Sequence, residues 1–132
     1  MDINFLAVIV AAILSFVIGS VWYSQKAFGK KWMALTNLNS EDFKKNAKGA
    51  MAGTILGGLV LACILAVFVG YANVDNFFDG ALVGFWAWLG FVVTTSSSSV
   101  LFERRPIGLF LMNIGFHLVE FVLMGALLAI WR

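Results

Sequence analysis

The sequence has little charge, one cysteine, one proline and one histidine among its 132 residues. Charged residues make up 12% and hydrophobic residues 61%, whereas soluble domains have about 25% and about 45–50%. The chain therefore has too few polar side chains to cover a water-facing surface, and we expect much of it to face lipid. One cysteine excludes a disulfide framework and a zinc site built on several thiolates. The small net charge of +2 gives no indication of a nucleic-acid partner.

Four apolar stretches follow one another along the chain, over about residues 3–22, 50–69, 77–101 and 107–131. Each reaches the roughly 20 residues that a helix needs to cross about 30 Å of hydrocarbon. The sequence therefore predicts an all-α membrane protein, with residues 1–132 forming a single domain of four transmembrane helices. Only Asp2 precedes the first stretch, so we expect a retained helix rather than a signal peptide, which begins with a basic segment.

The basic residues predict the orientation, because cytoplasmic loops carry an excess of lysine and arginine. The first loop holds six lysines and the third loop two arginines, so these loops carry eight of the nine basic residues. The second loop has Asp75 and Asp79 and no basic residue. We therefore expect loops one and three to be cytoplasmic and both termini to lie outside.

The first loop contains two helical patterns. Phe28, Trp32 and Leu35 recur at i, i+4 and i+7, which predicts a short amphipathic segment at the cytoplasmic interface. Ser40 precedes two acidic residues and is typical of a helix N-cap. A continuous helix from Ser40 to Gly70 would be about 46 Å long. It would project beyond the hydrocarbon, where it either only sets the topology or docks a partner.

Small residues recur every four positions on the first two helices. Lipid gives helices no hydrophobic reason to associate, so close contact between small residues holds a bundle together. Ala7, Ala11, Ser15 and Gly19 share one face of the first helix, and we expect this face to pack against the second helix. A face of small residues that is not used for packing within one copy suits a homo-oligomer interface. The candidate packing residues are Gly53, Gly57, Gly58, Ala62, Gly80 and Gly84.

The fourth helix carries a polar group of side chains near its middle. Asn113, His117 and Glu120 occur at i, i+4 and i+7 and so share one helical face. An acidic residue at the bilayer centre costs about 2.5–3.5 kcal/mol, so Glu120 must be paired, protonated or exposed to water. An ionisable group inside a membrane is by default a functional candidate. The pair His117 and Glu120 is either a proton relay or a structural clasp to another helix.

A metal site is disfavoured, because the other spans offer no third Asp, Glu or His ligand.

The third helix supplies six consecutive hydroxyl side chains, from Thr94 to Ser99. They mark the wet end of a helix or line a polar entrance for a solute or ion. The candidate polar pathway consists of Asn113, His117, Glu120, Thr94, Thr95 and Ser98.

Trp22 and Tyr23 end the first apolar stretch, where amphipathic aromatic residues anchor a helix at the headgroup level. Ser24 and the hydroxyl run should lie near the same membrane face, which also permits a polar vestibule. Gly29 allows the chain to turn before Trp32. The interfacial motif comprises Trp22, Tyr23, Ser24, Phe28, Gly29 and Trp32.

Together these motifs resemble a bacterial family of small four-span membrane proteins, the domain-of-unknown-function family numbered 1761. The resemblance covers nearly the whole chain. It implies the bacterial inner membrane and no established activity. The family usually has a proline after Trp-Tyr-Ser, where this chain has Gln25. The motifs that carry it are Trp22-Tyr23-Ser24, Phe28-Gly29, Trp32, Trp88-Leu89-Gly90-Phe91, Thr94-Thr95, Leu101-Phe102-Glu103, Arg105-Pro106, Asn113, His117-Leu118 and Met124-Gly125.

Three classes of function follow. The polar pathway favours an oligomeric channel or transporter for protons, small ions or solutes. The small-residue faces and the lysine-rich loop favour an accessory or scaffolding subunit that binds another membrane protein. An enzyme is the least favoured class, because the sequence shows no pair of nucleophile and base and no cofactor motif.

Overall fold

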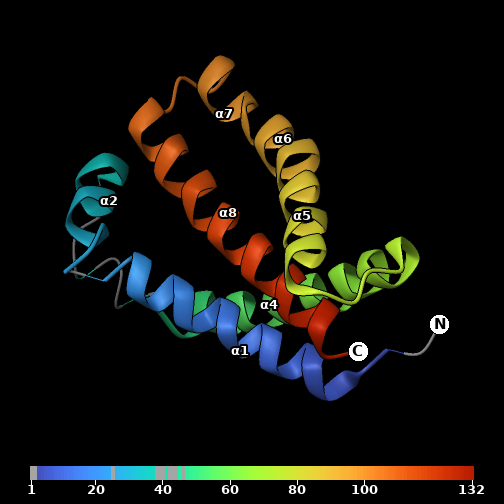
Figure 1. The fold of residues 1–132 in the computed structure, drawn as a ribbon. Coiled ribbons are helices and arrows are strands. Elements are labelled where there is room, and N and C mark those ends of the chain that lie inside the picture. The colour runs from blue at the N-terminus through green and yellow to red at the C-terminus, as the bar shows by residue number, and fades with distance from the viewer. Residues whose placement is uncertain (1–2, 25, 38–40, 42–44, 46) are drawn as a thin grey trace.

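The computed structural model describes residues 3–24, 26–37, 41, 45 and 47–132, and within these residues it contains helices and no strand (Figure 1). The long helices are α1 (Phe5–Trp22), α4 (Ala47–Ala72) and α8 (Ile107–Ile130), together with a composite helix over 77–101. All four are long and apolar enough to cross a membrane, with mean hydropathies of 2.6, 2.5, 1.5 and 1.9 in chain order. The prediction of an all-helical protein with four apolar helices is therefore confirmed.

The composite helix changes its winding twice. It begins as α5 (Phe77–Ala87), where the Asn76 side chain caps the first turn by accepting from the Asp79 N–H at 2.9 Å. It continues as a π-helical stretch, η1 (Trp88–Val93), and ends as α6 (Thr94–Ser96) and α7 (Ser98–Leu101). A tight turn then leads to Pro106, whose lack of an N–H suits the start of α8.

The first loop contains the short helix α2 (Gly29–Thr36), which coincides with the predicted amphipathic segment and contacts α8. The second long helix begins its described part at Ala47 and runs to Ala72, past its predicted end. The predicted start of this helix at Ser40 lies outside the described residues.

Helix α8 is central to the packing, since it contacts α1, α2, α4, α5 and η1. Its most extensive contact is with α5, and α1 also packs against α4. The buried core lies between α1, α4 and α8 towards the chain termini. It consists of Ala7, Val8, Ala11, Ala62, Leu65, Val69, Met124, Leu128 and Ala129.

The helices come together at the end of the molecule that carries the termini. There the Asn4 amide donates to the Trp131 carbonyl at 3.3 Å, and the Arg132 guanidinium donates to the Val74 carbonyl at 2.9 Å. Towards α2 and α7, α1 and α8 diverge (Figure 1). Loop one and loop three therefore share one end of the molecule, and loop two shares the other end with the termini.

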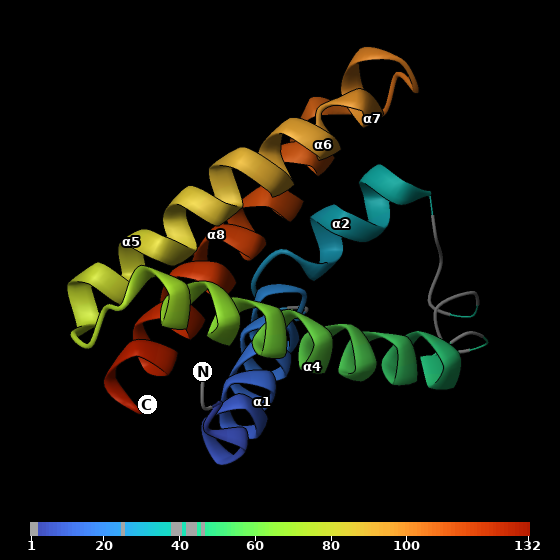
Figure 2. The ribbon, with the colours of Figure 1, turned by 90° about the vertical axis from the view of Figure 1, so that its right-hand side faces the viewer.

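The first half of α4 extends away from the other helices (Figure 2). Residues 48–57 are exposed on every side. Gly53 and Gly57, both predicted to serve helix packing, face open space within this chain. Within the described residues, no atom lies within 4 Å of a Cβ position at either glycine.

Candidate functional site

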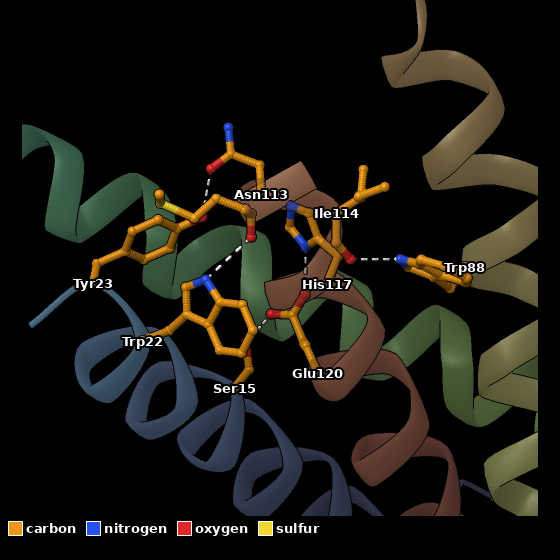
Figure 3. A network of polar contacts seen from close by, with 9 residues as sticks. Ser15, Trp22, Tyr23, Trp88, Asn113, Ile114, His117 and Glu120 are labelled. Carbon is orange, nitrogen blue, oxygen red and sulfur yellow. Dashed lines mark hydrogen bonds and ion pairs between the residues drawn. The ribbon is translucent and has the colours of Figure 1, made fainter. Parts of the chain in front are cut away.

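Glu120 is buried in the middle of α8, with 4% of its surface exposed. One carboxylate oxygen lies 2.8 Å from Nδ1 of His117, one turn earlier on the same helix. The other oxygen accepts a hydrogen bond from the Ser15 hydroxyl of α1 (Figure 3). Both oxygens therefore have a polar partner, which offsets the cost of burying a carboxylate.

Ser15 belongs to the buried small-residue face of α1, beside Ala11. Its hydroxyl crosses the α1–α8 interface to reach Glu120. Sequence reasoning placed Ser15 in a packing column and missed this role. Ser15 is the one residue with a hydroxyl on that face of α1, and this hydroxyl was the signal that could have indicated the bond.

The His117 side chain connects Glu120 with a more open region, because 40% of it is exposed whereas only 6% of the Glu120 side chain is. Phe116 and Phe121 flank the imidazole at ring-centroid distances of 4.9 and 6.4 Å. When Glu120 is ionised, Nδ1 of His117 carries the hydrogen and donates it. Nε2, on the far side of the ring, is then a hydrogen-bond acceptor.

A cleft of about 400 Å³ lies between the α6–α7 segment and the first half of α8. His117 lines it and Glu120 does not. Its polar wall on α6 and α7 consists of Thr95, Ser96, Ser98 and Ser99. The other residues that line it are Glu103, Arg105, Leu109, Phe110, Asn113, Ile114 and His117.

The structure brings most of the predicted polar pathway together. Asn113, His117, Thr95 and Ser98 line the cleft, and Glu120 lies behind His117. Thr94 does not line it; its hydroxyl donates to the Gly90 carbonyl at 2.6 Å. Ser96 and Ser99, from the same hydroxyl run, take part in the lining.

The end of α1 is bound to α8 through two aromatic side chains. The Trp22 indole donates to the Met112 carbonyl at 3.1 Å, and the Tyr23 hydroxyl donates to Oδ1 of Asn113 at 2.7 Å. Burial of the phenol, with a smaller contribution from the Glu120 charge, raises the pKa of Tyr23 to about 12. Tyr23 therefore remains a hydrogen-bond donor at physiological pH.

The rest of the interfacial motif supports this contact. Trp22 packs on Phe28 with ring centroids 4.8 Å apart, and Tyr23 packs edge-on against Trp32 at 5.9 Å. The Ser24 hydroxyl bonds to the Val21 carbonyl at 2.8 Å. Gly29 is buried in the turn, where a Cβ atom would lie 2.5 Å from the Tyr23 carbonyl oxygen. Only glycine fits this position.

Trp88 approaches α8 from the opposite side. Its indole donates to the Ile114 carbonyl at 2.7 Å, two residues along from the carbonyl that Trp22 uses. Trp88 is the first residue of the π-helical stretch η1. Such stretches are uncommon inside α-helices and often occur at functional sites.

Glycines hold α5 against the second half of α8, which does not line the cleft. Gly80 and Gly84 lie directly on the backbone of Gly125 and Phe121, respectively, so neither has room for a Cβ atom. Ala62 is fully buried in the core. Gly58 is less tightly packed, with Ser15 and Ala12 3.8 Å from a Cβ position.

The comparison with known families matches residues 6–129 to the family described as "Protein of unknown function (DUF1761)". The chain belongs to this family. Its description names no activity. Neither the comparison with curated proteins nor that with solved structures gave a match.

Several motifs by which the chain resembles the DUF1761 family meet at this site. Trp22 and Tyr23 from the end of α1 and Trp88 from η1 donate to α8 within residues 112–114, and His117 follows on the same helix. Within the described residues, no group of three or more His, Cys, Asp or Glu side chains is placed to hold a metal ion.

Proposed function

We propose that this DUF1761 protein is a proton-coupled membrane transporter in which Glu120 and His117 bind the proton. The observation that carries the proposal is a buried carboxylate bonded to a histidine that lines a polar cleft. Glu120 is bonded to His117 at 2.8 Å, and His117 lines the cleft. A proton from the cleft can bind at Nε2 of His117, and Nδ1 can pass its own proton to Glu120.

The packing favours a transporter over a permanently open channel. Beyond Ser15, towards the termini, Ala11 and Ala62 are fully buried and belong to the apolar core. A small cavity of about 20 Å³ beside Asn4 and Trp131 lies on the far side of this layer. Passage of a solute therefore requires a change in helix packing, which is the behaviour of a carrier.

We also propose that the protein acts as a homo-oligomer. Residues 48–57 of α4 are exposed on all sides, and Gly53 and Gly57 leave room for another helix to approach closely. A second copy would cover this half of α4 and enlarge the volume that four helices can enclose.

The proposed location is the bacterial inner membrane, with loops one and three in the cytoplasm and both termini outside. The basic residues of these loops support this orientation. The cleft is lined by Glu103 and Arg105 of loop three, so it would open towards the cytoplasm.

The experiment is proton flux in liposomes that contain the purified protein, driven by a pH gradient and followed with an internal pH dye. Glu120→Gln should abolish the flux while the protein stays folded, because the amide keeps the shape and can still accept from Ser15. Glu41→Gln, an exposed change in the first loop, is the matched control and should leave flux unchanged. Flux that persists in Glu120→Gln would overturn the proposal.

An accessory subunit is the second candidate, favoured by the same exposed half of α4. In that case another membrane protein, rather than a second copy, would cover Gly53 and Gly57. The two functions differ in one respect that the liposome experiment detects. A transporter moves protons when it is the only protein present, whereas an accessory subunit alone does not.

A further inference from the structure

Three of the four hydroxyl side chains that line the cleft offer hydrogen-bond acceptors rather than donors. A hydroxyl has one hydrogen to donate, and three of these side chains donate it to their own helix. Thr95 bonds to the Phe91 carbonyl, Ser98 to the Thr95 carbonyl at 3.3 Å and Ser99 to the Ser96 carbonyl at 2.8 Å. Their remaining lone pairs are available to a ligand in the cleft.

His117 adds a further acceptor of the same kind. While Nδ1 donates to an ionised Glu120, Nε2 presents a lone pair on the other side of the ring. Asn113 supplies the opposite chemistry, because its carbonyl oxygen already accepts from Tyr23 and its amide nitrogen is a donor.

The charges near His117 come from few groups. Glu120 lies on α8 itself and Tyr23 at the end of α1, while Glu103 and Arg105 lie in the turn before α8. Arg105 and Glu103 are 3.6 Å apart and largely exposed, so their charges compensate each other. η1, α6 and α7 contain no charged residue. With Tyr23 neutral, an ionised Glu120 is the charged group in direct contact with His117.

The cleft also has an apolar side, formed by Leu109, Phe110 and Ile114. A volume of about 400 Å³ is within the range of about 300–1,000 Å³ that holds small organic ligands. The face of a phenylalanine ring attracts cations. The ligand that matches this lining carries N–H donors, a positive charge and a compact apolar body.

We propose that the cleft binds a small organic ammonium ion, and that this ion and a proton exclude each other at Nε2 of His117. The inference rests on the proposed function and names its substrate class. In the ammonium-bound state, an ammonium N–H donates to the Nε2 lone pair and to the hydroxyl wall. The Glu120 charge stabilises the complex.

Proton binding removes that acceptor. A proton taken up from water bonds to Nε2, and the imidazolium then repels the ammonium ion. If Nδ1 passes its proton to Glu120, the neutral imidazole keeps its hydrogen on Nε2 and Glu120 loses its charge. In both proton-bound states Nε2 is a donor, so a bound proton and a bound ammonium ion exclude each other at this atom.

The test compares three ligands that share a benzene ring, namely benzylammonium, benzyl alcohol and benzoate. Binding to the protein in lipid nanodiscs is measured by calorimetry at about pH 8 and about pH 5.5. We expect benzylammonium to bind at least about tenfold more tightly than the other two ligands, a difference of about 1.4 kcal/mol. Its affinity should fall by a similar factor at the lower pH, and its binding at that pH should release protons.

Two matched variants test whether the hydroxyl side chains that line the cleft accept from the ligand. Ser99→Ala removes a lining hydroxyl and should weaken benzylammonium binding roughly fivefold to tenfold. Thr94→Ala removes a hydroxyl that is bonded to its own helix in the same way but does not line the cleft. It should leave the affinity unchanged.

Benzoate binding as tight as benzylammonium binding, or benzylammonium affinity that does not change with pH, would overturn the inference. Equal weakening by Ser99→Ala and Thr94→Ala would also overturn it. Proton flux without benzylammonium separates the two proposals. If flux depends on Glu120 but benzylammonium does not bind, only the ammonium inference fails. If benzylammonium binds as expected but Glu120→Gln leaves flux intact, the proposed proton-binding function fails.

Discussion

Gly84 of α5 lies directly against the backbone of Phe121 on α8, and a Cβ atom at position 84 would be 2.6 Å from the Phe121 carbonyl carbon. The opposing group is main chain, so a rotamer change cannot relieve the overlap. This contact sets how closely α5 and α8 approach, one residue away from Glu120.

Gly84→Ala should therefore lower the free energy of unfolding by about 1–3 kcal/mol, the usual cost of overpacking. Denaturant unfolding in detergent micelles, followed by tryptophan fluorescence, measures the change. The matched control is Gly90→Ala, where a Cβ atom meets nothing within 4 Å. Equal stability of the two variants would show that the α5–α8 contact is looser than described.

A second prediction concerns Tyr23 at alkaline pH. The folded state raises its pKa from 10.0 to about 12, so between these values the folded protein retains a proton that the unfolded chain loses. The stability contributed by the neutral phenol is fully present below about pH 10 and is lost as the pH rises towards about 12.

Tyr23→Phe should remove this alkaline loss, so thermal unfolding scans from pH 9 to pH 12 should fall less steeply for the variant. Tyr71 is the matched control, since it is 79% exposed, and Tyr71→Phe should follow the unmodified protein. The prediction fails if the two variants have the same pH dependence.

The Trp88 indole provides a third prediction. Trp88→Phe removes the 2.7 Å bond to the Ile114 carbonyl and should cost about 0.5–1.5 kcal/mol for the hydrogen bond, plus lost packing. Trp86 is 62% exposed, and Trp86→Phe should be close to neutral. Unfolding in micelles measures both changes, and a loss in Trp86→Phe as large as in Trp88→Phe would contradict the assignment.

The fourth prediction tests the orientation. In a Cys63→Ala background, single cysteines replace Asp75 in the second loop or Lys30 in α2, both of which are exposed. A membrane-impermeant maleimide added to intact cells should label the Asp75→Cys protein and leave Lys30→Cys unlabelled. The reverse pattern would invert the proposed topology.

The four helices were predictable because span length and hydropathy are local properties of the sequence. The spacing of Phe28, Trp32 and Leu35 similarly predicted the helix now seen as α2. The i, i+3 spacing of His117 and Glu120 predicted their shared face, and the two side chains are bonded.

The contacts that join distant helices were not predictable in this way. Ser15 and Glu120 are 105 positions apart, and one sequence contains no information on which small residue faces which polar one. The π-helical stretch at Trp88–Val93 was equally hidden, because hydropathy does not distinguish a π-turn from an α-turn. Trp22 and Trp88 were recognisable as aromatic motif residues, but their carbonyl acceptors on α8 depend on the helix crossing.

The glycine contact between α5 and α8 is a fixed point about which the other half of α8 can tilt. Gly125 is held against Gly80 near one end, and Asn113 is 12 residues away along α8, a lever arm of about 18 Å. A rotation of about ten degrees at this fulcrum displaces α8 at Asn113 by about 3 Å, the width of a water molecule. A small change in tilt at the close-packed end is thereby enough to admit or expel a layer of solvent at the hydroxyl-lined end.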